Sequence, residues 1–526
     1  MNRSWVILLI LSICTTDSYK FLVYSPMIGY SHQNYLGSIA DTLTEAGHDV
    51  TMLMPIYDKD LENKTVVKLT KKVIKLPPYP KNLEIFAARD AVFGNLWISQ
   101  PDMRSLIQLT HNFSVSSANT CEGLLNDDKL MKQLEVSKFD VGIAEPFTMC
   151  SFGIFELLKI PATIAALSVV HGEHISYCIG EPSVPSYVPG AMSVEGDRMN
   201  FISRVKNIVS GMLERQLYTG VYEREIATLR SKFGSQFKSY QELLAETSFV
   251  FTNSNPYLDY PRPMIHKTVP IGGITVRQKD KKDVLSEEWN TVLNRRNTTV
   301  LVSFGTVLKS VLMPQHYRKS ILTVFESMPN TTFIWKYEEE GSRIASHLKN
   351  VHLRTWVPQN ALLADPRLTV FVTHGGLGST TEIAHSGKPS ILIPLFADQT
   401  RNAQMLARHG GGIVLNKFDL ESPDKLRAAI EDIFNDASFS QKAKRLSEML
   451  LNKPVSPKEL VIKHCEFAAR FGRLPNLDPY GRHLSFVEYF LIDILLAVIG
   501  ILAVFTLLLG ILIRKCFSVT LKRKKD

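Results

Sequence analysis

Short apolar runs that read as β-strands alternate with helical stretches along most of the chain, and this alternation constrains the fold more than any other feature. The first unit runs from a strand at 21–25 through a helical pattern at 36–45 to a second strand at 50–54. Strand, helix, strand units build parallel sheets that are covered by helices. The pattern therefore predicts an α/β protein.

The same alternation occurs twice along the chain. A charged stretch with Pro270, Gly272 and Gly273, at 269–296, reads as the linker between the two halves. Further strands are expected at 139–144, 160–165, 299–304, 332–335, 369–373 and 390–394. We expect two Rossmann-like domains, 19–270 and 271–485, which face each other across a cleft and bind ligands at the carboxyl ends of their strands. The alternative is two unrelated α/β domains.

Both ends of the chain carry targeting signals. Residues 1–18 combine Arg3, a short apolar run and small or polar residues, which is typical of a secretory signal peptide. The run from Ile494 to Ile513 has twenty residues without a charge and reaches about 30 Å as a helix, so a transmembrane helix is predicted at 491–513. The basic tail at 514–526 then lies in the cytosol and residues 19–485 in the lumen.

The formal charge of +9 does not indicate a nucleic-acid partner, because the tail alone contributes +5. Lysines stand three and five places from the end, which resembles the retrieval signal of endoplasmic-reticulum residents; a stop-transfer cluster is the alternative. In the lumen, cysteines can form one or two disulfides, and sequons can carry glycans. The cysteines are Cys121, Cys150, Cys178 and Cys465, and the sequons stand at Asn63, Asn112, Asn297 and Asn330.

The most informative stretch runs from Trp356 to Gln404. His374 and two glycines lie there between an apolar strand that ends at Val372 and a helix that begins near Ser379. The start of a helix offers unpaired backbone N–H groups and a positive dipole end, and glycines let an anion approach closely. The pattern predicts a diphosphate site.

This stretch resembles the UDP-glycosyltransferase family, in its membrane-anchored UDP-glucuronosyltransferase branch. The resemblance rests on residues in order and at the family's spacing, which are Trp356, Gln359, His374, Gly375, Gly376, Ser379, Glu382, Gly387, Pro389, Pro394, Asp398, Gln399 and Asn402. It implies a GT-B fold of two facing Rossmann-like domains. One departure is visible, since Gly378-Ser379 stands where vertebrate members usually have Asn-Gly.

The resemblance also implies roles for the donor residues. His374, Gly376 and Ser379 would contact the phosphates, and Glu382 the ribose hydroxyls, while Trp356 and Gln359 would hold the uracil. Asp398 and Gln399 would bind sugar hydroxyls. The loop residues Ser303, Gly305 and Thr306 resemble a further donor contact.

A base that deprotonates the acceptor is expected in the N-terminal domain. His32, in the first loop after the first strand, resembles the family's catalytic histidine, and a carboxylate on its other nitrogen would fix its tautomer. The family usually places an aspartate there, whereas this chain has Glu145 at the matching position. Taken alone, a histidine in a loop is usually an ordinary surface or capping residue, and only the position of His32 after the first strand favours the catalytic role.

Metal ligands are not predicted. Asp58 and Asp60 have the DxD form of metal-dependent glycosyltransferases but sit in a polar loop, and His171 and His174 have no evident third ligand. We expect metal-independent transfer without a cofactor, in which a UDP-sugar is a co-substrate.

The expected function is transfer of a glycosyl group from a UDP-sugar to a hydroxyl of a small lipophilic acceptor, with inversion at the anomeric carbon. The resemblance implies that this group is glucuronic acid. The acceptor would lie in the N-terminal domain, against apolar patches such as Phe86 to Trp97. The alternatives are the same fold using UDP-glucose, and a catalytically silent membrane protein that binds nucleotide-sugars or lipids. The sequence is also compatible with a homo-oligomer.

Overall fold

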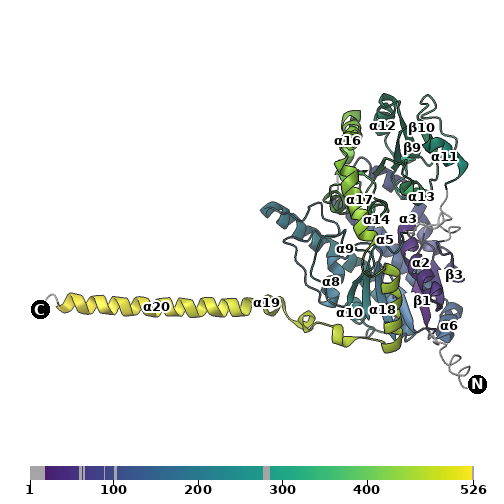
Figure 1. Cartoon of the computed structure of the whole chain (residues 1–526). Helices are drawn as coiled ribbons and strands as arrows, with labels where there is room; N and C mark the ends of the chain where they lie inside the picture. Colours follow the sequence, from purple (N-terminus) through teal and green to yellow (C-terminus); the bar gives the residue numbers. More distant parts are fainter. Residues whose placement is uncertain are drawn as a thin grey trace, which may run out of the picture.

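The computed structural model describes residues 18–57, 62, 66–87, 89–99, 103–276 and 285–523. The predicted signal peptide except Ser18, the centre of the predicted linker, Asp58, Asp60 and Asn63 lie outside these residues. Figure 1 shows a two-part body from which one long helix extends. Each part is built on one parallel sheet.

The N-terminal sheet has seven strands in the order β3-β2-β1-β4-β5-β6-β7. Its strands are β1 Lys20–Tyr24, β2 Asp49–Pro55, β3 Lys72–Leu76, β4 Val141–Ala144, β5 Ala162–Leu167, β6 Phe249–Thr252 and β7 Thr268–Pro270. Alternate side chains of β1 enter different cores, since Phe21 and Val23 pack on one face and Leu22 and Tyr24 on the other. Because helices cover both faces of the sheet, the side chains on both sides of β1 are buried, and its sequence is a continuous apolar run.

The C-terminal sheet has six strands in the order β10-β9-β8-β11-β12-β13. They are β8 Thr298–Ser303, β9 Thr331–Lys336, β10 Val351–Arg354, β11 Val370–Thr373, β12 Ser390–Leu392 and β13 Gly412–Val414. In both sheets the strand order reverses beside the first strand, between β1 and β4 and between β8 and β11. Loops diverge at such a point and leave a crevice for ligands.

The helices of the N-terminal part are α2 Tyr30–Glu45, α3 Leu83–Ala87, α4 Arg89–Asn95, α5 Met103–Leu125, α6 Asp128–Ser137, α7 Cys150–Leu157, α8 Glu173–Ile179, α9 Phe201–Phe233 and α10 Tyr240–Ala245. Those that follow β7 are α11 Glu287–Leu293, α12 Gln315–Ser327, α13 Gln359–Ala364, α14 Leu377–Ser386, α15 Gln399–Ala407, α16 Pro423–Asn435, α17 Ser438–Leu451, α18 Pro457–Phe471, α19 Phe486–Tyr489 and α20 Ile492–Arg523. The predicted α/β class and GT-B arrangement are confirmed.

The C-terminal boundary of the second domain differs from the one expected at 485. Helix α18 returns to the N-terminal sheet, where Val461, Cys465 and Ala468 are fully buried in the core with Phe21 and Val23. Its contacts are with α2, β4 and β5. The apolar face of a helix does not indicate which sheet it will cover, so the sequence pattern alone could not assign α18 to the N-terminal domain.

The segment around α4 also crosses between the two parts. Trp97 is fully buried and its ring lies 5.0 Å from that of Phe304, edge to face, in the C-terminal core. The Lys417 ammonium donates to the carbonyls of Leu96 and Ser99, at 2.7 and 2.6 Å. The expectation that Trp97 belongs to an acceptor pocket is wrong, because the C-terminal domain covers this side chain.

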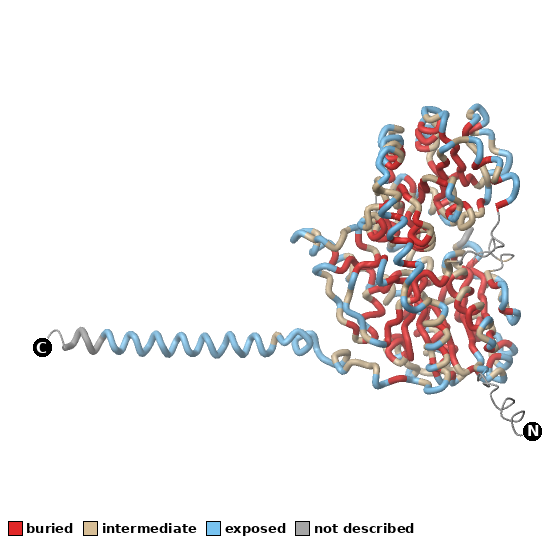
Figure 2. Tube along the Cα trace, in the orientation of Figure 1, coloured by how far each residue is buried: buried red, intermediate tan, exposed pale blue. Residues whose placement is uncertain are grey.

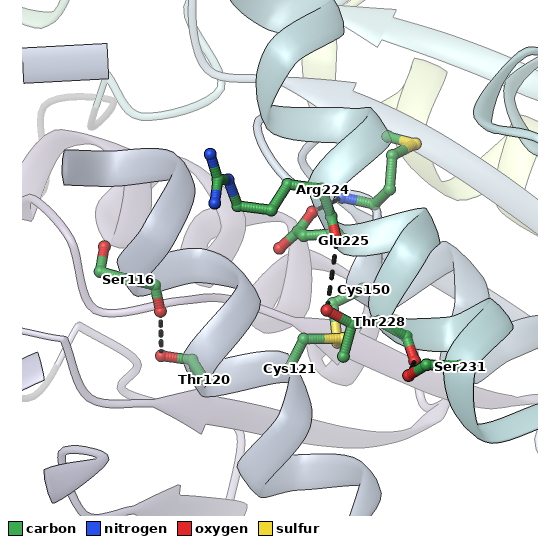
Figure 3. Close-up of a disulfide and its surroundings, with 9 residues drawn as sticks. Ser116, Thr120, Cys121, Cys150, Arg224, Glu225, Thr228 and Ser231 are labelled. Carbon is green, nitrogen blue, oxygen red and sulfur yellow. Dashed lines mark hydrogen bonds between the residues drawn. A yellow bond between two sulfur atoms is a disulfide. The ribbon is translucent and has the colours of Figure 1, made fainter. Parts of the chain in front are cut away.

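One disulfide joins Cys121 in α5 to Cys150 at the start of α7 (Figure 3). Glu225 of α9 lies beside it and accepts a hydrogen bond from the Met149 N–H. Burial raises the pKa of Glu225 to about 8, against the opposing effect of its backbone hydrogen bonds. Cys178 and Cys465 are buried free thiols, so one of the two possible disulfides is present in the part of the chain described.

Candidate active site

The predicted catalytic pair sits where the N-terminal strand order reverses. His32 is in the first turn of α2, which follows β1, and Glu145 directly follows β4. Tyr24 of β1 pairs with Ala144 of β4, so the two strands end side by side. The topology thereby brings together two side chains that are 113 positions apart in the chain.

His32 and Glu145 are in direct contact. Nδ1 of His32 lies 2.7 Å from Oε2 of Glu145, whose side chain is fully buried, whereas that of His32 is 21% exposed. The second oxygen, Oε1, accepts a hydrogen bond of 2.8 Å from the backbone N–H of Ser168. With the carboxylate held at both oxygens, Nδ1 carries the hydrogen and Nε2 presents its lone pair. The longer glutamate arm therefore reaches the histidine.

The charges around His32 favour its protonated form. Burial pushes the pKa of His32 down, but the charge of Glu145, the hydrogen bond to it and the charge of Asp398 together outweigh burial, so that its pKa is raised. Asp398 belongs to the C-terminal domain, and burial raises its own pKa, with His32 among the groups that oppose this. The two domains thus place an imidazole and a carboxyl group in one electrostatic environment.

Ser168 is a member of this cluster that sequence reasoning missed. Its hydroxyl oxygen lies 2.8 Å from Nδ1 of His32, and its carbonyl accepts a hydrogen bond of 2.8 Å from the Asn253 side chain. It is the first residue after β5, beside β4 in the sheet. The sequence feature that could have identified Ser168 is its position as a polar residue at the carboxyl end of a central strand.

On the C-terminal side, the predicted phosphate-site residues gather where β8 and β11 end. Ser303 pairs with Thr373 across these strands, so that the loop with Gly305 and Thr306 lies beside His374. A Cβ on Gly305 or Gly376 would stand 2.7 Å from an atom of the His374 ring, so a side chain at either position would displace that ring. Burial, with a smaller effect of the Lys336 charge, lowers the pKa of His374 to about 4, and the imidazole is neutral at pH 7.

Three of the predicted donor-site residues are joined by hydrogen bonds. Nε2 of Gln359, at the start of α13, donates to Oγ of Ser379 at 3.1 Å and to Oε2 of Glu382 at 2.5 Å. Ser379 and Glu382 lie in the first two turns of α14, which begins directly after Gly376. Free backbone N–H groups of this helix start and a carboxylate one turn later thus border the same space.

Trp356 presents an indole that is 56% exposed. Its ring lies 6.2 Å from that of Tyr30 in the N-terminal domain, edge to face. The Lys336 ammonium lies 5.8 Å from its centroid and donates to the Gly305 carbonyl at 2.8 Å. Lys336 ends β9 and is a second residue that sequence reasoning missed. An open aromatic face with a cation nearby can stack a planar base.

Asp398 and Gln399 differ in which of their side-chain atoms are available to a ligand. Asp398 accepts a hydrogen bond of 2.7 Å from the Asn402 side chain, one turn later in α15. Oε1 of Gln399 accepts from the backbone N–H groups of Leu395 and Phe396, at 2.9 and 3.1 Å. The carbonyl oxygen of Gln399 is therefore engaged in shaping its own loop, and its amide nitrogen is the atom with which it can reach a ligand.

The sequence of nearly the whole chain matches one protein family. The model of the family described as "UDP-glucoronosyl and UDP-glucosyl transferase" matches residues 20–526. The chain belongs to this family. It is therefore a glycosyltransferase that uses a UDP-sugar, which confirms the resemblance seen in the motif at 356–404.

Curated relatives of this glycosyltransferase match along most of their length. Human UDP-glucuronosyltransferase 1A1 is 30% identical over 502 residues, which cover 93% of this chain and 89% of that protein. The mouse protein of the same name is 29% identical over 504 residues, with 94% and 90% covered.

Solved structures share the fold at low identity. The glycotransferase of kitacinnamycin matches with a TM-score of 0.58 and 16% identity, covering 88% of this chain and 100% of that one. Spinosyn rhamnosyltransferase SpnG complexed with thymidine diphosphate matches with a TM-score of 0.52 and 16% identity, covering 84% and 99%. They support the two-domain GT-B arrangement of the glycosyltransferase.

The histidines weighed as metal ligands have separate partners. Nε2 of His171 lies 2.7 Å from Glu181, and Nδ1 of His174 lies 2.9 Å from Glu214. Among the described residues, no group of three or more His, Cys, Asp or Glu side chains is placed to hold a metal ion. Metal independence stays a prediction, and Asp58 and Asp60 lie outside the described residues.

The predicted glycosylation sites differ in exposure. Asn297 and Asn330 are exposed, and Asn112 is half-buried in α5, where its Oδ1 accepts from Gln108. Asn63 lies outside the described residues. Glycan occupancy at all four sequons stays a prediction.

Proposed function

We propose that this glycosyltransferase transfers glucuronic acid from UDP-glucuronic acid to a hydroxyl group of a small lipophilic acceptor, with inversion at the anomeric carbon and without a metal. The observation that carries the proposal is the contact between His32 and Glu145, on which the charge of Asp398 acts from the other domain. The names of the full-length relatives support glucuronic acid as the sugar.

His32 is proposed as the base. Its Nε2 has no hydrogen-bond partner among the described residues and can accept the proton of the acceptor hydroxyl, while Glu145 stabilises the imidazolium that forms. The acceptor oxygen then attacks the anomeric carbon from the face opposite the diphosphate, which leaves as UDP. Phe147 packs edge to face on the His32 ring at 4.9 Å and supplies an apolar wall for the acceptor.

The donor is proposed to bind along α13 and α14. Trp356 stacks on the uracil, Glu382 accepts hydrogen bonds from the ribose hydroxyls, and the start of α14 with Ser379 holds the diphosphate. His374 is neutral at pH 7 and contributes a ring N–H to a phosphate oxygen. Asp398 accepts from the sugar hydroxyls, next to the acceptor that His32 activates.

The proposed location is the endoplasmic-reticulum membrane, with the catalytic domains in the lumen. Helix α20 contains a 26-residue segment, Ile492–Phe517, within which an 18-residue window has a mean hydropathy of 3.0 and is exposed throughout. The basic tail that follows favours the cytosolic side for the C-terminus.

The test is product mass spectrometry. Full-length protein is incubated with a phenol panel and an equimolar mixture of UDP-glucuronic acid, UDP-glucose and UDP-N-acetylglucosamine, with His32→Ala as the control. A product mass that corresponds to an added glucuronic acid, lost in the control, is expected. Undiminished transfer by His32→Ala would show that His32 is not the base.

UDP-glucose is the second candidate donor. It is favoured by the departure at Gly378-Ser379 from the Asn-Gly of vertebrate relatives, at the helix start that faces the donor. The family description also covers both sugars. A product carrying only hexose in the mixed-donor assay selects this candidate, and the roles of His32 and Glu145 are unchanged by that outcome.

A further inference from the structure

The first three turns of α9 carry an exposed apolar stripe. At 100° per residue around a helix, its members fall within an arc of about 120°. They are Phe201, Ile202, Val205, Ile208, Val209 and Met212, with 73, 64, 45, 40, 47 and 67% of their surface exposed. We call this the outer face of α9. Three basic residues, Arg204, Lys206 and Arg215, flank it on both sides.

The polar side of the same helix is turned into the protein. Asn207 and Glu214, directly opposite the outer face, are 2% and 1% exposed. The Asn207 side chain accepts from the Gly190 N–H at 3.0 Å and donates to two carbonyls of the preceding loop at 2.8 Å. Glu214 pairs with His174. A surface helix in water normally faces the other way, so the outer face of α9 is suited to an apolar environment.

The outer face is continuous with the point at which the chain enters the membrane. Helix α8 packs against α9, and the short helix Tyr480–His483 contacts α8 in turn, with Arg482 against Gly180. Only the exposed apolar turn α19 separates that helix from α20. In Figures 1 and 2 the beginning of α9 projects from the body on the side from which α20 leaves.

We propose that the outer face of α9 docks on the bilayer into which α20 inserts, lying at the boundary between headgroups and acyl chains. Residues 198–213 hold three basic side chains, those of Arg198, Arg204 and Lys206, and no acidic one. A long cationic side chain at the edge of an apolar stripe can reach the phosphates of lipid headgroups. The partner is therefore a phospholipid surface. A second copy of the chain would find no acidic residue within this stretch to match its charge.

Docking would connect the bilayer with the site. Further along α9, the Tyr218 ring lies 5.4 Å from that of Phe147, which in turn contacts His32. A lipid-dissolved acceptor would then have a short aromatic route to the base; this consequence rests on the proposed function, whereas the docking itself does not.

The experiment measures lipid contact position by position. Full-length protein, with Cys14 and Cys516 replaced by serine, receives a single cysteine by Val205→Cys or Met212→Cys, which is labelled with an environment-sensitive NBD dye. Val136→Cys is the matched control, because Val136 is an apolar residue of α6 that is 67% exposed. Helix α6 lies on the far side of the body from α20 (Figure 1). The proteins are reconstituted in phosphatidylcholine vesicles with and without nitroxide-labelled acyl chains.

Labels at 205 and 212 are expected to lose at least half of their fluorescence to the nitroxide lipid, and the label at 136 less than a tenth. Equal thermal unfolding of the three proteins confirms that labelling leaves the fold intact. Quenching at 205 and 212 no stronger than at 136 overturns the proposal. Energy transfer between chains labelled at 205, without lipid quenching, also overturns it and identifies the outer face as an interface between two copies. None of these readings depends on which sugar is transferred, or on any activity.

Discussion

Replacing Glu145 by glutamine tests how the site holds its base. The substitution keeps the shape of the side chain, and the Ser168 N–H continues to require a carbonyl oxygen at the position of Oε1. The amide nitrogen must then face Nδ1 of His32, where the carboxylate now lies at 2.7 Å. Because an amide N–H donates, it favours the tautomer in which Nε2 carries the hydrogen and cannot act as a base.

The magnitude follows from the lost interaction. A hydrogen bond to a charged group contributes about 1.5–3 kcal/mol, and each 1.36 kcal/mol in the barrier changes the rate tenfold, so kcat is expected to fall roughly 10- to 160-fold. The tautomer change adds to this loss. Removing the Glu145 charge also leaves burial as the main influence on the pKa of His32, and that pKa falls.

The assay is kcat/KM for the best phenol acceptor between pH 5.5 and 9. His32 must be neutral to accept a proton, so the wild-type rate rises as the pH passes the raised pKa of His32. In Glu145→Gln, the remaining activity should rise at lower pH than in the wild type. Glu145→Asp is the control, since it restores the charge on a shorter arm and should lose less activity than the amide. A Glu145→Gln protein with kcat within threefold of wild type and an unmoved pH profile would refute the reasoning.

Four further changes have expected outcomes. Trp356→Ala should weaken UDP binding by roughly 5- to 150-fold in calorimetry, from about 1–3 kcal/mol of stacking, and unchanged affinity would contradict the proposed uracil site. Ser168→Ala keeps the backbone N–H and should lower kcat by about two- to tenfold through the lost hydroxyl alone; an unchanged kcat would show that only the N–H matters. Glu225 keeps its proton in the folded protein up to about pH 8, whereas the unfolded chain ionises above pH 4.5, so wild-type stability falls with rising pH across that window. Glu225→Gln should therefore gain melting temperature relative to wild type from pH 5 to 8, and parallel curves would contradict the raised pKa. Cys121→Ser opens a loop with a sequence separation of 29 residues and should cost about 3–4 kcal/mol in urea unfolding; a loss below about 1 kcal/mol would mean that the disulfide adds little.

What the sequence by itself determined was local in character. Period and length of the apolar runs placed β1, β4 and β8 within two residues of their observed starts, because strand formation depends on neighbouring residues. The motif from Trp356 to Gln404 was equally readable, since its polar residues come from three short helices and the loops beside them. Helix α20 was also predictable, because a run of twenty uncharged and mostly apolar residues continues one helix without interruption.

Only the tertiary structure decided which distant segments meet. Ser168 reaches His32 across 136 positions, and Lys336 lies beside Trp356, because neighbouring parallel strands end at one edge of a sheet. The return of α18 to the N-terminal sheet, the burial of Trp97 and the choice of Cys150 as the partner of Cys121 were decided in the same way. Apolar periodicity specifies that a face will be buried, but the shape and position of the other elements determine what covers it.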